Sequence, residues 1–272
     1  MVVNKLMEKE KSLHKIVLIG AGNLATNLGK VLVSKGYSVV QVYSRTEESA
    51  KNLATTLSAA YTTSLDEVRK DATLYIVSLK DSALIELLPE IVADKQDSFF
   101  VHTAGSISMD IWKGYVKHYG VFYPMQTFSK SREVDFCRIP IFLEANEPSG
   151  LSILREIANE LSVSVHEVSS EQRRYLHLSA VFACNFTNHM YTLTEKLLHK
   201  YGIPFDVMLP LIDETANKIH ELSPEKAQTG PAIRYDLNVI NKQLELLSDE
   251  PEMRQLYELI SKDIHRINEN KR

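Results

Sequence analysis

The chain contains 272 residues, of which 44% are hydrophobic and 24% charged, a balance typical of a folded protein with one large or two medium domains. A net charge of −4 argues against a nucleic-acid-binding surface, and Cys137 and Cys184 form neither a metal-binding nor a disulfide pattern. No segment has the apolar length of a signal peptide or a membrane-spanning helix. We therefore exclude fibrous, disordered and disulfide-stapled classes, and we expect a cytoplasmic protein without a nucleic-acid or membrane partner.

The first half of the chain alternates short apolar runs with amphipathic stretches. Six segments have the composition of buried strands: 15–20, 38–44, 73–79, 98–104, 120–124 and 138–145. Three segments between them have the apolar spacing of helices: 23–36, 46–59 and 81–94. This alternation predicts a doubly wound, mainly parallel α/β sheet with right-handed crossovers.

The second half has a different pattern. After residue 169 no strand is evident, and four segments have helical spacing: 171–202, 204–222, 235–248 and 251–269. We therefore predict an α/β domain over 1–165, with an N-terminal extension at 1–14, followed by an all-helical domain over 166–272.

A glycine-rich loop joins the first predicted strand to the first predicted helix. Its six residues are Gly20, Ala21, Gly22, Asn23, Leu24 and Ala25. The pattern G-x-G-x-x-A between a strand and a helix predicts a Rossmann-type dinucleotide site. The first glycine permits the tight turn, the second lets a pyrophosphate approach the backbone, and the helix N-terminus offers N–H donors to phosphate. The alternative is a structural turn that binds no ligand.

The end of the second predicted strand bears on which dinucleotide binds. It carries Ser44, Arg45 and Thr46, and it lacks the acidic residue that binds the ribose 2′-hydroxyl of NAD. Arg45 can pair with a 2′-phosphate, and both hydroxyls can donate hydrogen bonds to it. The sequence thus favours NADP(H) over NAD(H). The alternative is that Arg45 is solvated and Thr46 only caps a helix.

Two further loops follow predicted strands at the edge where such sheets bind ligands. We expect five of their residues to contact the nicotinamide half of the cofactor: Ser78, Leu79, Thr103, Ala104 and Gly105. Asp81 either belongs to this site or caps the helix that it begins.

Five short strings together resemble one family of NADP oxidoreductases, in which a Rossmann-like domain precedes a helical domain of unknown function. They are GAGNLA, SRT, HTAGS, YPMQTF at 123–128 and TGPAIRYD at 229–236. The family falls within the superfamily of 6-phosphogluconate dehydrogenase and pyrroline-5-carboxylate reductase. The resemblance covers nearly all of the chain after residue 14, and it implies a substrate cleft between the domains and a homodimer formed through the helical domains.

The chain departs from related patterns at two places. Similar proteins often have histidine where Tyr123 stands. Hydroxyacid dehydrogenases of the superfamily carry a catalytic lysine on the inter-domain helix, whereas the start of that helix here offers Arg173, Arg174 and His177. The mechanism of those dehydrogenases therefore does not transfer directly.

Reduction of a C=O or C=N group needs a proton donor near the nicotinamide. His177 is our first candidate, since it lies early on the predicted inter-domain helix and imidazole is suited to proton transfer near neutral pH. Asn185, about two turns further on, and Lys80 are the other catalytic candidates, and His102 and Tyr123 are also available. The alternative for His177 is a hydrogen-bonded core residue.

Four residues are candidates for substrate binding: Tyr123, Gln126, Thr229 and Arg234. The last two flank a turn forced by Gly230 and Pro231, where Arg234 can hold a substrate carboxylate or pair with Asp236.

No metal site is expected. The leading hypothesis is an NADP(H)-dependent oxidoreductase that transfers hydride to or from a small polar substrate bound between the domains; the alternative is an NADP(H)-binding regulatory or sensor protein without turnover.

Overall fold

The structure is a computed structural model that describes residues 14–269, so the predicted N-terminal extension lies outside the described residues apart from His14. The chain divides into two compact units, Met1–Cys184 and Asn185–Arg272. The first unit contains the whole described sheet, and the described part of the second unit is helical. The domain boundary at residue 165 remains a prediction; the last strand of the sheet, Val165–Glu167, begins at that residue.

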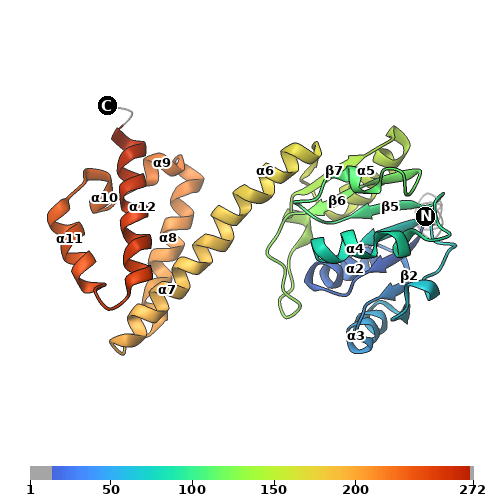
Figure 1. Cartoon of the computed structure of the whole chain (residues 1–272), viewed down its shortest axis with the longest axis horizontal. Coiled ribbons are helices and arrows are strands. Elements are labelled where there is room, and N and C mark those ends of the chain that lie inside the picture. The colour runs from blue at the N-terminus through green and yellow to red at the C-terminus, as the bar shows by residue number, and fades with distance from the viewer. Residues whose placement is uncertain (1–13, 270–272) are drawn as a thin grey trace, which may run out of the picture. The chain divides into compact units, whose positions relative to one another are not determined.

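The first unit is built on an eight-stranded sheet in the order β3-β2-β1-β4-β5-β6-β7-β8 (Figure 1). The strands are β1 Lys15–Ile19, β2 Ser38–Tyr43, β3 Ala60–Thr62, β4 Leu74–Val77, β5 Phe99–His102, β6 His118–Pro124, β7 Ile141–Ala145 and β8 Val165–Glu167. Every neighbouring pair is parallel except β6 and β7. This confirms the predicted mainly parallel, Rossmann-like sheet.

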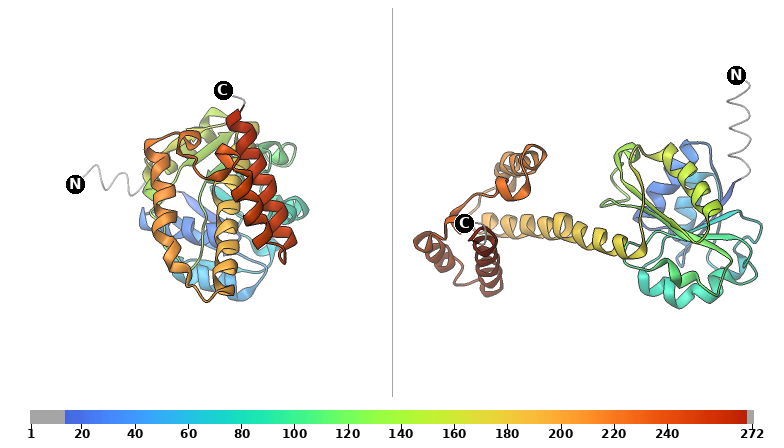
Figure 2. Two further views of the ribbon diagram at one scale, coloured as in Figure 1. Left: turned by 90° about the vertical axis from the view of Figure 1, so that its left-hand side faces the viewer. Right: turned by 90° about the horizontal axis from the view of Figure 1, so that it is seen from above.

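Helices cover both faces of this sheet, as the right-hand view of Figure 2 shows. One face packs against α2 Asn23–Ser34, α3 Glu47–Leu57 and α5 Pro148–Leu161. The other packs against α4 Asp81–Val92 and the short helix η2 Met109–Trp112. Two further short turns of helix are η1 Leu65–Glu67 and η3 Phe136–Arg138. Side chains alternate between the faces along each buried strand, so that each face has its own apolar core.

The first unit ends in α6 Ser170–Ala180, whose first turn is fixed by a capping box between Ser169 and Gln172. The hydroxyl of Ser169 accepts a hydrogen bond from the N–H of Gln172, and the Gln172 side chain accepts one from the N–H of Ser169. A π-helical segment, Val181–Phe186, follows and contains the limit between the units. The predicted helix over 171–202 is therefore helical, but its hydrogen-bonding pattern changes midway.

The second unit consists of helices. They are α7 Thr187–Lys200, η5 Phe205–Met208, α8 Leu209–Glu221, α9 Pro224–Ala227, α10 Pro231–Arg234, α11 Leu237–Leu246 and α12 Pro251–Glu269. The last three pack against one another. Among residues 14–269, no helix has the length and apolar character needed to cross a membrane.

Candidate functional site

The loops after β1, β2, β4 and β5 lie at one edge of the sheet, where the carboxyl ends of these parallel strands meet. β1 and β4 are neighbours in the sheet, yet the helices that follow them, α2 and α4, cover opposite faces. Such a reversal is the position where open α/β sheets bind their ligands. The predicted cofactor residues of the first unit all lie in these loops or at the start of α2.

The two glycines of the first loop differ in what the absence of a side chain provides. Gly20 has a φ of +119°, and a Cβ on it would lie 2.3 Å from the carbonyl oxygen of Ser78. Gly22 has an ordinary φ of −78°. A Cβ on Gly22 would meet no protein atom within 4 Å. The fold itself thus requires glycine at position 20, whereas at position 22 the open space is what a closely approaching phosphate would need.

The start of α2 has free hydrogen-bond donors beside this space. No side chain caps the helix, and its first turn contains no acidic residue. The N–H groups of Asn23, Leu24 and Ala25 have no acceptors within the helix, because the first intrahelical bond runs from Thr26 to Gly22 at 3.0 Å. Ala25 is fully buried, so that the helix packs closely on the strand. This arrangement fits the pyrophosphate of a dinucleotide.

The loop after β2 presents a cation to solvent. Ser44 is half-buried, while Arg45 and Thr46 are exposed. Arg45 makes no ion pair with any residue in the range 14–269. Thr46 occupies the N-cap position of α3, but its side chain makes no capping bond, so the proposal that it serves only as a cap finds no support in the geometry. Glu47 in the first turn of α3 accepts a hydrogen bond from the hydroxyl of Tyr61 at 3.2 Å.

The loops after β4 and β5 are joined to each other. The hydroxyl of Thr103 donates a hydrogen bond to that of Ser78 at 3.1 Å. The N–H of Thr103 donates to the carbonyl of Val77 at 3.1 Å. Leu79 and Ala104 are half-buried beside them. These small and apolar groups lie where we expect the nicotinamide half of the cofactor to bind.

Asp81 lies at the start of α4, but it does not cap the helix. The N-cap residue is Lys80, which makes no capping bond. The carboxylate of Asp81 instead accepts a hydrogen bond from the hydroxyl of Ser106 in the loop after β5. Lys80 is exposed. Of the two alternatives for Asp81, the geometry therefore favours membership of the predicted cofactor site over helix capping.

His177 on α6 lies against the loop after β5 and next to β6. Its Nδ1 is 3.0 Å from the hydroxyl of Tyr123, and the two rings meet edge to face at 6.1 Å. A Cβ on Gly105 would lie 2.7 Å from both Cγ and Nδ1 of His177. The absence of a side chain at Gly105 is thus what lets the imidazole approach the predicted nicotinamide loop.

Tyr123 is 7% exposed and packs in a small apolar core with Val121 and Phe142. Burial raises the pKa of Tyr123, and the positive charge of Arg173 partly offsets this rise. The phenol is therefore neutral near pH 7, and its hydroxyl can donate to the Nδ1 of His177. Tyr123 was expected to bind substrate, and the structure shows that its hydroxyl is already engaged with His177.

Two further polar residues of the first unit, His102 and Arg173, are fully buried. His102 accepts a hydrogen bond from the N–H of Ala104 at 3.2 Å. Burial first, and the charge of Arg173 second, lower the pKa of His102 from its ordinary value of 6.5 to about 3. Arg173 forms an ion pair with Glu144. From the sequence, Arg173 was identified only as an early residue of the predicted inter-domain helix, although its spacing of four residues from His177 indicates a shared helix face.

The other expected site residues are dispersed. Gln126 is exposed, and its side-chain oxygen accepts a hydrogen bond from the N–H of Thr127 at 2.8 Å. Asn185 is exposed in the π-helical segment. Arg234 is exposed at the end of α10 and pairs with no residue of the described chain, while Asp236 caps α11. The structure thus supports a cap at Asp236 without the proposed pairing to Arg234.

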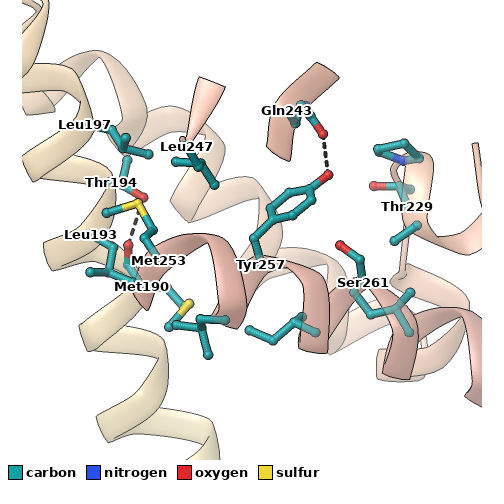
Figure 3. A pocket seen from close by; sticks show the side chains of 15 residues that line it. Met190, Leu193, Thr194, Leu197, Thr229, Gln243, Leu247, Met253, Tyr257 and Ser261 are labelled. Atoms are coloured by element: carbon teal, nitrogen blue, oxygen red, sulfur yellow. Dashed lines mark hydrogen bonds between the residues drawn. The ribbon is translucent and has the colours of Figure 1, made fainter. Parts of the chain in front are cut away.

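Thr229 lines a cavity of about 470 Å³ within the second unit (Figure 3). Side chains of α7, α11 and α12 surround it, and most of them are apolar. Its few polar groups include the hydroxyl of Tyr257, which donates to the side-chain oxygen of Gln243, and the buried Ser261. Within the described chain no group of three or more histidine, cysteine or acidic residues could hold a metal ion.

Comparison with known families gives two matches. Residues 15–105 match the family described as NADP oxidoreductase, coenzyme F420-dependent. Residues 139–264 match a domain of unknown function, DUF2520. A "putative NADP oxidoreductase" from Bacteroides fragilis is 63% identical in sequence, with a TM-score of 0.90 over 93% of this chain and 98% of that chain. No curated protein matches the chain.

More distant structures share the fold. A 1-pyrroline-5-carboxylate reductase from Streptococcus pyogenes is 15% identical, with a TM-score of 0.62 over 93% of this chain and 98% of that chain. An imine reductase from Myxococcus stipitatus in complex with NADP+ is 16% identical, with a TM-score of 0.63 over 94% of this chain and 93% of that chain. At these identities the likeness concerns the fold alone.

Proposed function

Because the chain belongs to the family of NADP oxidoreductases that carry a C-terminal DUF2520 domain, we propose that it transfers a hydride between NADP(H) and a small polar substrate. The observation that carries this proposal is the pair formed by Tyr123 and His177 at 3.0 Å, placed directly against Gly105 in the loop after β5. A hydride acceptor needs a proton at the same place, and this pair is the group best placed to provide it.

We assign the cofactor to the carboxyl edge of the sheet in the first unit. The open space over Gly22 and the free donors of α2 would hold the pyrophosphate. Ser44, Arg45 and Thr46 would hold the 2′-phosphate, since Arg45 is exposed and has no competing partner within residues 14–269. The loops after β4 and β5 would receive the nicotinamide: Ser78, Leu79, Thr103, Ala104 and Gly105.

His177 is the proposed proton donor. Bound NADPH would supply the hydride. If the hydroxyl of Tyr123 donates to Nδ1 of His177, the ring hydrogen resides on Nε2, which makes no hydrogen bond to a described residue. As hydride adds to the carbon of a C=O or C=N group, that hydrogen can pass to the oxygen or nitrogen while the Tyr123 hydroxyl passes its own hydrogen to Nδ1, so that His177 stays neutral and the negative charge resides on the Tyr123 oxygen until solvent reprotonates it. Lys80, at the start of α4, and Asn185 remain the other candidates for a direct contact with substrate.

We propose a C=N or C=O compound bearing a carboxylate as the substrate class. The solved reductases that share the fold are named for pyrroline-5-carboxylate and imines, in which hydride adds to carbon and a proton to nitrogen. Arg234 is exposed and makes no ion pair within the described chain, so its guanidinium is available for a carboxylate. Gln126 and Thr229 are the proposed neutral hydrogen-bonding partners.

The experiment combines binding with turnover. Purified protein should bind NADPH, and a panel of cyclic imino acids, 2-oxo acids and aldehydes should contain at least one compound that oxidises it. His177→Gln should then retain NADPH affinity and lose at least a hundredfold in kcat, which is the low end for removal of a general acid. Unchanged kcat in that variant would show that His177 is not the donor.

A regulatory or sensor protein is the second candidate. It is favoured by one observation, that α6 contains no lysine over Ser170–Ala180, where related dehydrogenases carry their catalytic lysine. NADPH binding without turnover across the whole panel would support this reading. Failure to bind either NADPH or NADP+ would contradict both.

We also propose a homodimer formed through the helical unit. From α7 to α9, no described residue is buried, although exposed large apolar side chains lie along these helices: Tyr201, Ile203, Val207, Leu209, Leu211, Ile219 and Leu222. A run of apolar surface of this extent is unusual for a protein that works alone. A second copy that covers it would give these helices the core that one chain does not provide.

A further inference from the structure

Arg173 is a fully buried charge near the candidate site, and its guanidinium joins three parts of the first unit. Nη1 forms an ion pair with the carboxylate of Glu144 on β7. Nη2 donates to the carbonyl of Ile107, in the loop after β5, and to the hydroxyl of Ser170 at 3.1 Å. A buried guanidinium is costly unless such partners satisfy it. These partners satisfy the two terminal nitrogens, whereas Nε makes no hydrogen bond to a described residue, so that part of the cost remains.

Ser170 completes the same network at the start of α6. Its hydroxyl donates to Glu144 at 2.7 Å, and its N–H donates to the same carboxylate at 2.8 Å. The N–H of Met109 in turn donates to the Ser170 hydroxyl at 2.8 Å. The first turn of α6 is thereby tied to β7 and to the start of η2, which follows the loop after β5. These are the elements that set the position of His177.

The charge of Arg173 also acts on the neighbouring ionisable groups. The ionisable groups on α6 that act on Tyr123 are His177 and Arg173, and the two strands that flank β6 carry His102 on β5 and Glu144 on β7. Burial raises the pKa of Tyr123 and Arg173 lowers it, while burial and Arg173 together lower the pKa of His102.

We propose that Arg173 is a positioning residue for the pair formed by Tyr123 and His177. Its network with Glu144 and Ser170 holds α6 against the loop after β5, and its positive charge makes the Tyr123 hydroxyl a stronger donor to Nδ1 of His177. The hydrogen of the imidazole is then held on Nε2, the atom that faces away from Tyr123. Arg173 has no exposed surface and cannot touch a ligand, so this role rests on the proposed function of His177.

The test uses a double variant and two controls. Arg173→Met with Glu144→Leu replaces the buried ion pair by apolar side chains, a change that proteins often tolerate without loss of stability. Arg173→Lys keeps the charge, and Arg174→Met removes the exposed charge next to it in sequence. The measurements are the ¹⁵N shifts of His177, which report its tautomer, the titration of the Tyr123 phenol by ¹³C NMR, and the Kd of NADPH by fluorescence.

We expect the double variant to bind NADPH within about twofold of the wild-type Kd, a difference well below 1 kcal/mol. We also expect its His177 to populate both tautomers and its Tyr123 to titrate at higher pH. Arg173→Lys should preserve the wild-type titration of Tyr123, and Arg174→Met should resemble wild type throughout. A single His177 tautomer and an unshifted Tyr123 titration in the double variant would overturn the proposal. Wild-type protein that binds no NADPH would instead refute the proposed function, which is a separate result.

Discussion

Gly20 and Gly22 are two residues apart in the loop after β1, and the physical reasons for glycine differ between them. At Gly22 the backbone is ordinary and the space above it is empty of protein atoms. We predict that Gly22→Ala leaves the thermal unfolding midpoint unchanged and raises the Kd of NADPH at least tenfold, about 1.4 kcal/mol. The new methyl group would occupy the space assigned to the pyrophosphate. Differential scanning fluorimetry and NADPH fluorescence titration measure the two quantities.

Gly20→Ala serves as the matched comparison. Its Cβ would lie 2.3 Å from the Ser78 carbonyl oxygen at a φ of +119°, so this substitution should destabilise the fold by about 1–3 kcal/mol or more. A Gly22→Ala protein that unfolds as early as Gly20→Ala, or that binds NADPH normally, would contradict the assignment of this space to a phosphate.

Arg45 is predicted to determine the preference for NADPH over NADH. It is exposed and has no ion pair within residues 14–269, so its guanidinium can turn to a 2′-phosphate without breaking a contact. Arg45→Ala should weaken NADPH binding by roughly tenfold to a hundredfold, the range for a charge-assisted hydrogen bond, and should leave NADH binding unchanged. Competition binding with the two nucleotides measures the ratio.

Lys51→Ala is the control for Arg45→Ala, because Lys51 is another exposed cation of the same region, on α3. It should alter neither affinity beyond about twofold, since a solvent-exposed charge at a distance is screened by salt. Equal losses of NADPH affinity in the two variants would mean that the overall positive charge of this region attracts the cofactor, rather than a specific contact by Arg45.

The residues of the site differ in how far the sequence could identify them. The loop at Gly20–Ala25 is one contiguous motif, and it is recognised by the strand that precedes it and the helix that follows it. All three could therefore be predicted together from the sequence. The pair of Tyr123 and His177 is separated by 54 positions and depends on how α6 meets β6. The burial of Arg173 depends on Glu144 from another strand, and periodicity within one helix does not reveal such a partner.

At the scale of elements, the sequence did not predict two short strands, one regular helix and one atypical helical segment. β3 and β8 have three residues each, too few for a periodic pattern to be recognised. α5 was also not predicted, although its buried residues Leu154, Ile157, Ala158 and Leu161 have helical spacing. The π-helical segment Val181–Phe186 carries no sequence signal of its own, because its extra residue per turn is set by packing.

The end of β5 leads to a prediction about pH. His102 is fully buried, and its pKa falls from 6.5 to about 3 on folding, so the folded protein keeps it neutral. Below pH 6.5 only the unfolded chain takes up the proton, and stability therefore decreases as the pH falls from about 6.5 towards 3, by about 1.4 kcal/mol per unit. Above pH 6.5 this contribution to stability is fully present.

The variant His102→Asn tests this. The asparagine oxygen can replace Nδ1 as acceptor for the N–H of Ala104, and asparagine does not titrate. Between pH 7 and pH 5, the wild-type free energy of unfolding should fall by about 2 kcal/mol more than that of the variant. Urea unfolding at the two pH values gives the difference. An equal fall in both proteins would show that His102 does not remain neutral when folded.

At the scale of the whole molecule, the two units differ in how well they bury their apolar residues. The sheet of the first unit has an apolar core on each face, whereas the helices α7 and α8 bury no residue within the described chain. Helices of this length are marginal without tertiary packing. The second unit is thus the part of the chain whose stability we expect to depend on association.

Association through α8 is the last prediction. The wild-type protein should have twice the chain mass of 30.9 kDa by light scattering. Leu211→Glu places a charge on a side chain that is 57% exposed and should shift the mass to one chain, since burial of an unpaired carboxylate opposes association. Val163→Glu changes an 83% exposed residue of the first unit and should leave the mass unchanged. A wild-type mass of one chain would contradict the dimer, and a dimer that survives Leu211→Glu would exclude this face of α8.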